Sequence, residues 1–216
     1  MMKFRVQKRL ALVLAGVSLV GALSACAPLI LGGAFVGGMM ASDRRTSGSQ
    51  VEDEGIELRA GGRIGESLGE RAHVNVTSYN RQVLLTGEVP NTQDKQLAEQ
   101  VASRVENVKV VVNELGVMTP SSFSQRAADA LITGKVKASL LDAKDLSTNA
   151  FKVVTERGTV YVMGRVTQRE AIRVTDIVRG ISGVLKVVRV LEIISENELI
   201  NMTAPSTSAA PPSPPQ

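Results

Sequence analysis

The 216-residue chain contains an internal repeat, and this feature restricts its fold more than any other. Residues 74–89 are similar to residues 151–166, at an offset of 77 positions. Coincidence of several positions at one offset indicates two small domains of the same fold rather than one larger domain. The coincident pairs are Val76/Val153, Val83/Val160, Leu85/Val162, Gly87/Gly164 and Val89/Val166.

Each copy has the pattern of a helix, a β-hairpin, a second helix and a strand. Alternating apolar residues on both sides of a short turn predict the hairpin. The last strand should pair in parallel with a hairpin strand, because a helix supplies the crossover. The predicted fold class is therefore α+β, with two tandem αββαβ units, each a three-stranded mixed sheet with two helices on one face. The first helices are expected at residues 52–69, where four glycines each cost about 1 kcal/mol, and at residues 121–141.

The N-terminal 25 residues have the layout of a secretory signal peptide. A basic start is followed by an apolar run over residues 10–20 and by small residues. The sequence Leu23-Ser24-Ala25-Cys26 resembles the bacterial lipobox, which implies that Cys26 is lipidated. An ordinary signal peptide with a chance cysteine is the alternative. Cys26 is the single cysteine, so an intrachain disulfide is excluded. In lipoproteins of this kind, the absence of Asp at position 27 implies export to the outer membrane.

The remaining boundaries follow from composition. Residues 26–51 are expected to form the lipidated cysteine and a flexible tether, although residues 27–41 are apolar enough that a second membrane helix is the alternative. Residues 52–117 and 118–195 are the two repeats. Residues 196–216 are expected to be a disordered tail, since Pro, Ser, Thr and Ala dominate its end and cannot bury a core.

The repeat resembles the BON domain. The hairpins that end at Gly87 and Gly164, the Ala/Val-rich helix after them and the motif at residues 183–187 (Gly-Val-Leu-Lys-Val) carry the resemblance. The first copy departs from this motif, since Asn107 replaces its usual glycine, but both residues tolerate positive φ. A lipobox followed by two such copies is similar to the dual-BON outer-membrane lipoproteins of Gram-negative bacteria.

This resemblance implies a non-enzymatic, lipid-anchored protein at the periplasmic face of the outer membrane. It further implies binding of anionic phospholipids such as phosphatidylglycerol and cardiolipin by the second copy, a role in envelope integrity and gathering at division sites. The alternative function is a periplasmic adaptor for cell-division or outer-membrane-assembly proteins, bound through exposed strand edges or the acidic first copy.

Residues that could perform catalysis are scarce. His73 is the single histidine, so no second His or Cys can complete a zinc site with it, and no serine-nucleophile or phosphate-binding glycine motif is present. We expect no catalytic residue, no metal and no cofactor. The acids Glu52, Asp53, Glu54 and Glu57 are expected to complement the dipole of a helix start, with a calcium site as the less favoured alternative.

Charge differs between the two copies. The net charge of +4 comes from the leader, and residues 52–117 carry net −4 whereas residues 118–195 carry net +5. The second copy is therefore suited to an anionic partner. Aromatic residues make up only 3% and Trp is absent, which argues against nucleic acid because base stacking has few platforms.

The helix at residues 121–141 is the candidate lipid-binding element. If Ala128, Ile132, Val136 and Leu140 face the core, Leu131 falls on the flank of this stripe, bordered by cations. The alternative is that Leu131 only widens the core stripe. The predicted lipid-binding residues are Leu131, Ile132, Lys135 and Lys137.

Overall fold

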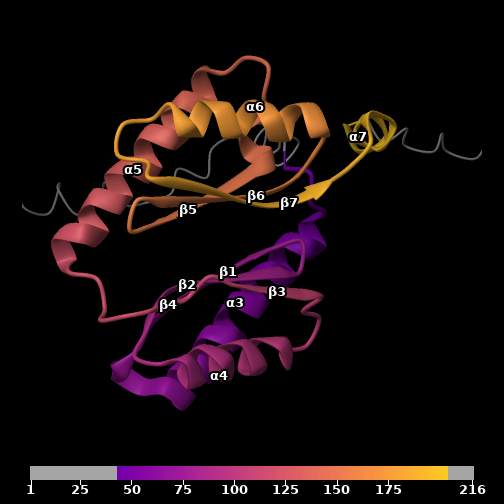
Figure 1. Ribbon diagram of the computed structural model, residues 1–216. Helices are drawn as coiled ribbons and strands as arrows, with labels where there is room; N and C mark the ends of the chain where they lie inside the picture. The colour runs from indigo at the N-terminus through magenta and orange to yellow at the C-terminus, as the bar shows by residue number, and fades with distance from the viewer. Residues whose placement is uncertain (1–42, 204–216) are drawn as a thin grey trace, which may run out of the picture. The chain divides into compact units, whose positions relative to one another are not determined.

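The computed structural model describes residues 43–203, which belong to one compact unit (Figure 1). The predicted signal peptide, Cys26, most of the predicted tether and residues 204–216 lie outside the described residues. Over the described range, none of the helices has both the length and the apolar character required to cross a bilayer.

The first repeat has the predicted order of elements. Strands β1 and β2 form an antiparallel hairpin, and β3 pairs in parallel with β2. The sheet has one strand more than predicted, because the two-residue β4 resumes pairing with β2 after an interruption at residues 114–115. The elements are α3 (Ser47–Leu68), the 3-10 turn η2 (Gly69–Arg71), β1 (His73–Tyr79), β2 (Gln82–Val89), α4 (Thr92–Ser103), β3 (Val110–Asn113) and β4 (Gly116–Val117).

The second repeat has three strands, as predicted. Strand β5 is antiparallel to β6, and β7 is parallel to β6 over eight residue pairs. The elements are α5 (Phe123–Asp142), the 3-10 turn η3 (Thr148–Ala150), β5 (Phe151–Glu156), β6 (Thr159–Val166), α6 (Gln168–Arg179), β7 (Lys186–Ile193) and α7 (Glu196–Thr203). The predicted α+β class with two αββαβ units is confirmed.

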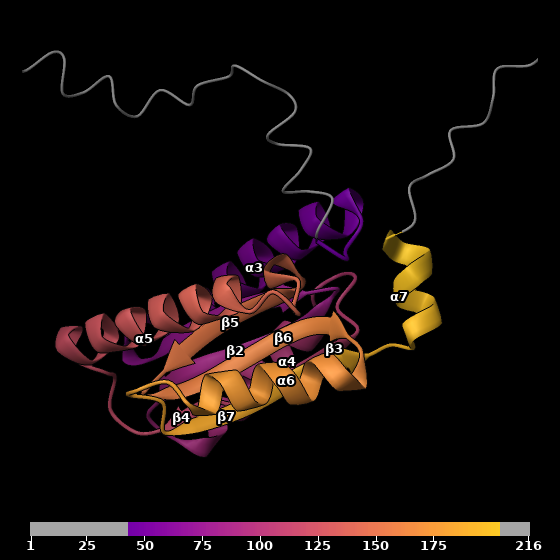
Figure 2. The same cartoon turned by 90° about the horizontal axis from the view of Figure 1, so that it is seen from above.

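Each repeat has its own helix-covered core. In the first, α3 and α4 pack on one face of the sheet around Val83 and Leu85. In the second, α5 and α6 pack on one face around Val160 and Val162. Figure 2 shows the helices lining their sheets. Burial of these apolar side chains is the main stabilising contribution within each repeat.

The other face of each sheet is also buried, because the two sheets contact one another. Tyr79 and Leu84 of the first repeat pack with Tyr161, Met163 and Val190 of the second. Polar contacts surround this apolar centre: the Tyr79 hydroxyl donates to the carbonyl of Ala150 at 3.2 Å. The repeats therefore form a continuous structure, with sheet packed on sheet in the middle and helices outside.

A buried aspartate fixes the hairpin turn of each repeat. In the first, both turn residues, Asn80 and Arg81, have positive φ, and their N–H groups donate to the Asp53 carboxylate at 2.7 Å each. In the second, the N–H groups of Arg157 and Gly158 donate to Asp129 at 2.8 Å each. Asp53 is 1% exposed and Asp129 is 6% exposed, so both carboxylates act inside the fold.

This arrangement corrects the predicted core stripe of α5. The pattern predicts Ala128 in the core, but it is exposed, and Asp129, one residue later, points inward instead. Ile132, Val136 and Leu140 are buried as predicted. The hydrophobic pattern missed Asp129 because a carboxylate is normally assigned to the surface.

Helix α3 forms despite its glycines. Its buried residues recur every four positions from Ile56 to Leu68, while Gly62 and Gly65 lie on the exposed side. Packing of this apolar stripe outweighs the low helix propensity of glycine. The helix starts at Ser47 rather than at residue 52, capped by the Thr46 hydroxyl, which accepts from the N–H of Ser49.

The segment before α3 is attached to both repeats and is not a free tether. Arg44 forms a buried ion pair with Glu170 at 2.7 Å and also donates to the carbonyl of Arg165. Arg45 pairs with Asp53 at 2.8 Å, and its guanidinium lies 4.4 Å from the centre of the Tyr79 ring. The predicted boundary of the tether at residue 51 is therefore corrected, since residues 43–51 belong to the fold.

The predicted tail also begins too early. Residues 196–203 form helix α7, and Glu198 pairs with Arg165 at 3.0 Å. The Pro-rich composition that indicated disorder starts only after this helix, outside the described residues.

Replacing Asp129 by alanine should destabilise the protein by about 2–5 kcal/mol, because two buried turn amides lose a charged acceptor. Urea unfolding of the wild type and the variant measures this change. Asp145→Asn is the matched control: its carboxylate is half exposed in a pair with Arg173, so we expect a loss below about 1 kcal/mol. Equal losses for the two variants would contradict the role given to Asp129.

Gly87→Ala should destabilise the protein severely. Gly87 has φ of 109°, and a Cβ there would lie 2.1 Å from the carbonyl oxygen of His73 in the neighbouring strand. Gly65→Ala should do the opposite and stabilise by up to about 1 kcal/mol, since its Cβ would meet nothing within 4 Å and alanine favours a helix. Thermal denaturation of both variants tests the contrast, and a stable Gly87→Ala protein would refute it.

Candidate functional site

Helix α5 is the element that carries the predicted site. It starts at a capping box in which the Ser122 hydroxyl accepts from the N–H of Gln125 and the Gln125 side chain accepts from the N–H of Ser122. Its inner face is anchored by the core residues and by Asp129, and the hydroxyl of Thr133 donates to that of Thr155 at 2.7 Å. The outer face is therefore held in a fixed orientation.

Three large apolar side chains are exposed on that outer face. Phe123 is 81% exposed, and Leu131 and Leu141 are each 69% exposed. Phe123 and Leu141 are 18 positions apart, which is about five full helical turns, so both project in the same direction from the helix axis. Leu131 projects about 80° away from this direction. The three side chains thus share one side of the helix, and small residues (Ala127, Ala130, Gly134 and Ala138) occupy the positions between them.

Cations border this apolar stripe on both sides. Lys135 and Lys137 are exposed, and at about 100° per residue they fall on opposite flanks of the line through Leu131 and Leu141. The exposed acid on the helix, Asp142, lies at its C-terminal end. We call Phe123, Leu131, Lys135, Lys137 and Leu141 the α5 surface.

The loop between α6 and β7 extends this surface. The Lys135 ammonium donates to the carbonyl of Ser182 at 3.4 Å, which brings the loop beside α5. Leu185 in the loop is 82% exposed, and Lys186 follows it. Leu185, whose N–H donates to the carbonyl of Gly158 in the β5–β6 turn, adds a further exposed apolar side chain next to a lysine in this loop.

The structure decides against the alternative that Leu131 only widens the core stripe, and it removes Ile132 from the predicted lipid-binding residues. Leu131 points to solvent, so it does not widen the core stripe. Ile132 is 8% exposed and packs in the second core, which removes it from the residues that the helix presents to a partner. Lys135 and Lys137 lie where the pattern placed them. The pattern missed Phe123, Leu141 and Leu185, although Phe123 and Leu141 could have been found by extending the outer stripe of α5 toward both ends of the helix.

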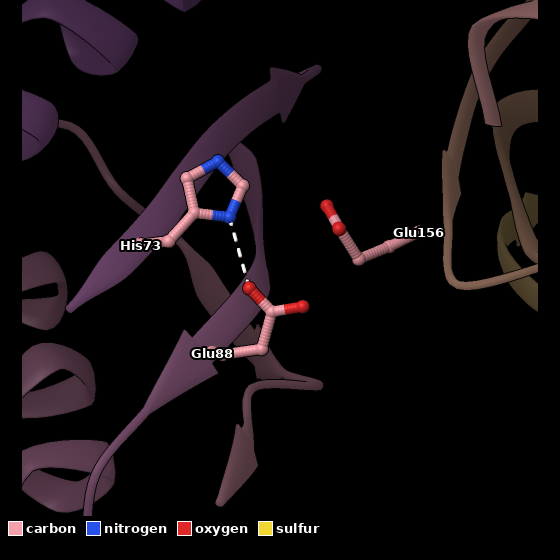
Figure 3. A group of neighbouring side chains, drawn as sticks. All are labelled: His73, Glu88 and Glu156. Carbon is pink, nitrogen blue, oxygen red and sulfur yellow. Dashed lines mark hydrogen bonds and ion pairs between the residues drawn. The ribbon is translucent and has the colours of Figure 1, made fainter. Parts of the chain in front are cut away.

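His73 lies in a cluster at the junction of the repeats (Figure 3). Its Nδ1 is 3.0 Å from Oε2 of Glu88, the residue directly opposite it in the hairpin. Glu156 of the second repeat points toward both side chains. Burial tends to raise the pKa of Glu88, but hydrogen bonds from Arg157 and His73 outweigh it and hold that pKa below its usual value. Burial and the charge of Glu88 raise the pKa of Glu156.

Three of the acids that the sequence placed at a helix start lie inside α3 and have structural partners. Glu52 pairs with Arg59 at 2.7 Å, and Asp53 binds the hairpin turn. Glu57 accepts from the N–H of Ser78 and pairs with Lys152 of the second repeat at 2.6 Å. The dipole interpretation is wrong, because α3 begins at Ser47 and its first turn holds no acid. The contacts of Glu52, Asp53 and Glu57 with side chains and amides account for these carboxylates without a calcium ion.

Comparison with known proteins is consistent with this architecture. The BON domain pattern matches residues 52–119 and 128–195, which together cover most of both repeats. The "21 kDa hemolysin" of Actinobacillus pleuropneumoniae is 31% identical over 154 residues, which are 70% of this chain and 79% of that protein. The C-terminal domain of CdsD, a structural protein of the type III secretion system of Chlamydia trachomatis, matches with a TM-score of 0.28 and 12% identity over 62% of this chain and 96% of that one, too slight a similarity to carry an argument.

A relative with greater identity is the outer membrane lipoprotein DolP of Haemophilus influenzae. It is 37% identical over 174 residues, which are 80% of this chain and 90% of that protein. Both the family match and this relative span the two repeats found in the sequence. The chain therefore belongs to the BON-domain family and is an outer-membrane lipoprotein with two BON repeats, similar to DolP.

Proposed function

We propose that the second repeat of this lipoprotein binds the anionic phospholipid surface through the α5 surface. The observation that carries the proposal is the exposure of Phe123, Leu131 and Leu141 on one side of a helix that lysines flank. Exposed apolar stripes with cationic borders are typical of helices that lie in a membrane interface. Support for envelope integrity and gathering at division sites belong to the same proposal and rest on the family resemblance.

The energies are sufficient for reversible binding. Each apolar side chain that leaves water contributes about 1.5–3 kcal/mol, and each lysine near an anionic surface contributes about 1 kcal/mol. The costs of orienting the domain offset part of this sum. A lipid anchor at Cys26 would hold the domain near the bilayer, so weak intrinsic binding is enough. The role needs no catalytic step.

A second candidate function is a protein adaptor. In the described part of the chain, β7 lies at the end of its sheet and pairs only with β6, which leaves its outer edge open to a strand of another protein. The net charge of −4 over residues 52–117 suits a basic partner. Site-specific crosslinking from β7 in cells tests this function, and the absence of a reproducible adduct would count against it.

The lipid proposal predicts selective binding to anionic vesicles. A chain that starts at residue 27 should co-sediment with phosphatidylglycerol or cardiolipin vesicles, release at high salt, and ignore phosphatidylcholine. Leu131→Glu with Lys135→Glu should weaken binding at least tenfold, because an inserted side chain and a cation are both replaced by acids.

The matched control lies in the first repeat. Leu58 is 78% exposed on α3 and Lys109 is exposed near β3, so Leu58→Glu with Lys109→Glu makes the same change in charge and polarity far from α5 in sequence. This control should bind nearly as well as the wild type. Equal loss of vesicle binding in both double variants would show that net charge, rather than the α5 surface, determines binding. No binding by the folded wild type would make the adaptor the leading function.

A further inference from the structure

The cluster of His73, Glu88 and Glu156 brings together side chains that are distant in the sequence. His73 and Glu88 face each other across the β1–β2 hairpin, and Glu156 comes from the end of β5 in the other repeat. One nitrogen or oxygen atom from each side chain lies within 4.8 Å of the other two (Figure 3). Both carboxylates lie far from His73 in the sequence or across a hairpin, so no ligand spacing typical of a zinc motif links the three residues.

The donor set suits a borderline transition metal. Zinc accepts imidazole nitrogen and carboxylate oxygen in one site, with water in a remaining position, whereas calcium and magnesium take oxygen ligands only. We propose that His73, Glu88 and Glu156 bind a divalent ion of the zinc type at the junction of the two repeats. This inference is independent of the lipid-binding proposal.

Both carboxylates are already oriented by further contacts. Nε of Arg157 donates to Oε1 of Glu88 at 2.5 Å, and Oε2 of the same group faces His73. The side-chain amide of Asn75 donates to Oε2 of Glu156 at 3.1 Å. In each case one oxygen has an outer hydrogen bond and the other can serve the ion, an arrangement that orients ligands in natural metal sites.

The negative charges of the two carboxylates are not fully neutralised by their neighbours, so the cluster can accept a cation. Glu88 is fully buried and pairs with the Arg157 guanidinium, and Glu156 is 8% exposed. The hydrogen-bond partner shown for Glu156 is a neutral amide. Since a buried carboxylate is costly without compensation, a divalent ion would stabilise this junction.

Two buried hydroxyls give a second, independent indication of a ligand. Thr86 is fully buried and Ser121 is 4% exposed, and among the described residues neither hydroxyl oxygen has a hydrogen-bond partner. Thr86 is on the same face of β2 as Glu88 and directly opposite Asn75, while the Ser121 backbone hydrogen-bonds Glu88. Buried hydroxyls are normally paired, and waters on a metal ion here would pair them.

An entry path is also present. A cavity of about 390 Å³ between α5 and β5 is lined by Glu156 and Asn75 together with Arg126, Asp129 and Thr133. Of the three cluster residues, Glu156 lines this cavity. An ion can therefore approach Glu156 without unfolding of either repeat.

The test is zinc binding by the lipidated full chain, purified in detergent without a polyhistidine tag and stripped with a chelator. Calorimetric titration with zinc chloride should give one ion per chain. At a free zinc concentration of 100 times the dissociation constant, the melting temperature of the protein should rise by about 5–10 °C. Cobalt chloride should produce a d–d absorption spectrum that zinc abolishes.

His73→Gln and Glu156→Gln should each weaken zinc binding at least tenfold and remove the melting shift, and the melting curve of each stripped variant shows whether it is folded. Glu57→Gln is the matched control, since it breaks the ion pair with Lys152 between the repeats but lies outside the cluster, and it should bind zinc like the wild type. Zinc binding that is absent, or that survives in the folded Glu156→Gln protein, overturns the proposal.

Discussion

The structure depends on two buried carboxylates, one in the first helix of each repeat. Asp53 and Asp129 accept the turn amides of their hairpins, where positive φ values are needed at Asn80, Arg81, Arg157 and Gly158. Three of these four turn residues are not glycine, so their conformation is unfavourable by itself. The hydrogen bonds to the carboxylate stabilise the positive-φ conformation that these turn residues do not favour by themselves. The carboxylate also sets the register of the hairpin, which places each alternate side chain on the helix face or on the face between the sheets.

The packing of sheet on sheet explains why the strands are more apolar than an open sheet requires. Strand β2 has buried residues on both faces, with Leu85 toward the helices and Leu84 toward the other repeat. Strand β6 repeats this with Val162 and Met163. Adjacent apolar residues such as Leu84 and Leu85 are typical of strands covered on both sides. Such adjacent apolar residues are therefore a sequence sign that the repeats pack together, although they interrupt the alternation expected of a strand with one open face.

Much of the fold could be predicted because it follows from periodicity, whereas the failures share a physical cause. The repeat, the hairpins and the parallel last strand were visible as patterns in residues that are close in sequence. Asp129, Arg44 and Glu156 depend on contacts between distant segments, such as Arg44 with Glu170, which no local pattern records. Part of the α5 surface was predicted: Leu131, Lys135 and Lys137 follow from the helix period, whereas Phe123 and Leu141 near the helix ends were missed. Leu185 is outside this surface, and only the contact of Lys135 with the loop at Ser182 brings its loop beside the helix.

The contacts of Arg44 and Arg45 have a mechanical consequence for a protein anchored at one end. A lipid on Cys26, as the sequence predicts, would lie within about 60 Å of residue 43, which is 17 positions further along the chain. A force from the membrane would act on the described chain at Asp43. The next residue, Arg44, is paired with Glu170 of the second repeat, and Arg45 is paired with Asp53 of the first. These two ion pairs thus attach the first described residues to both repeats.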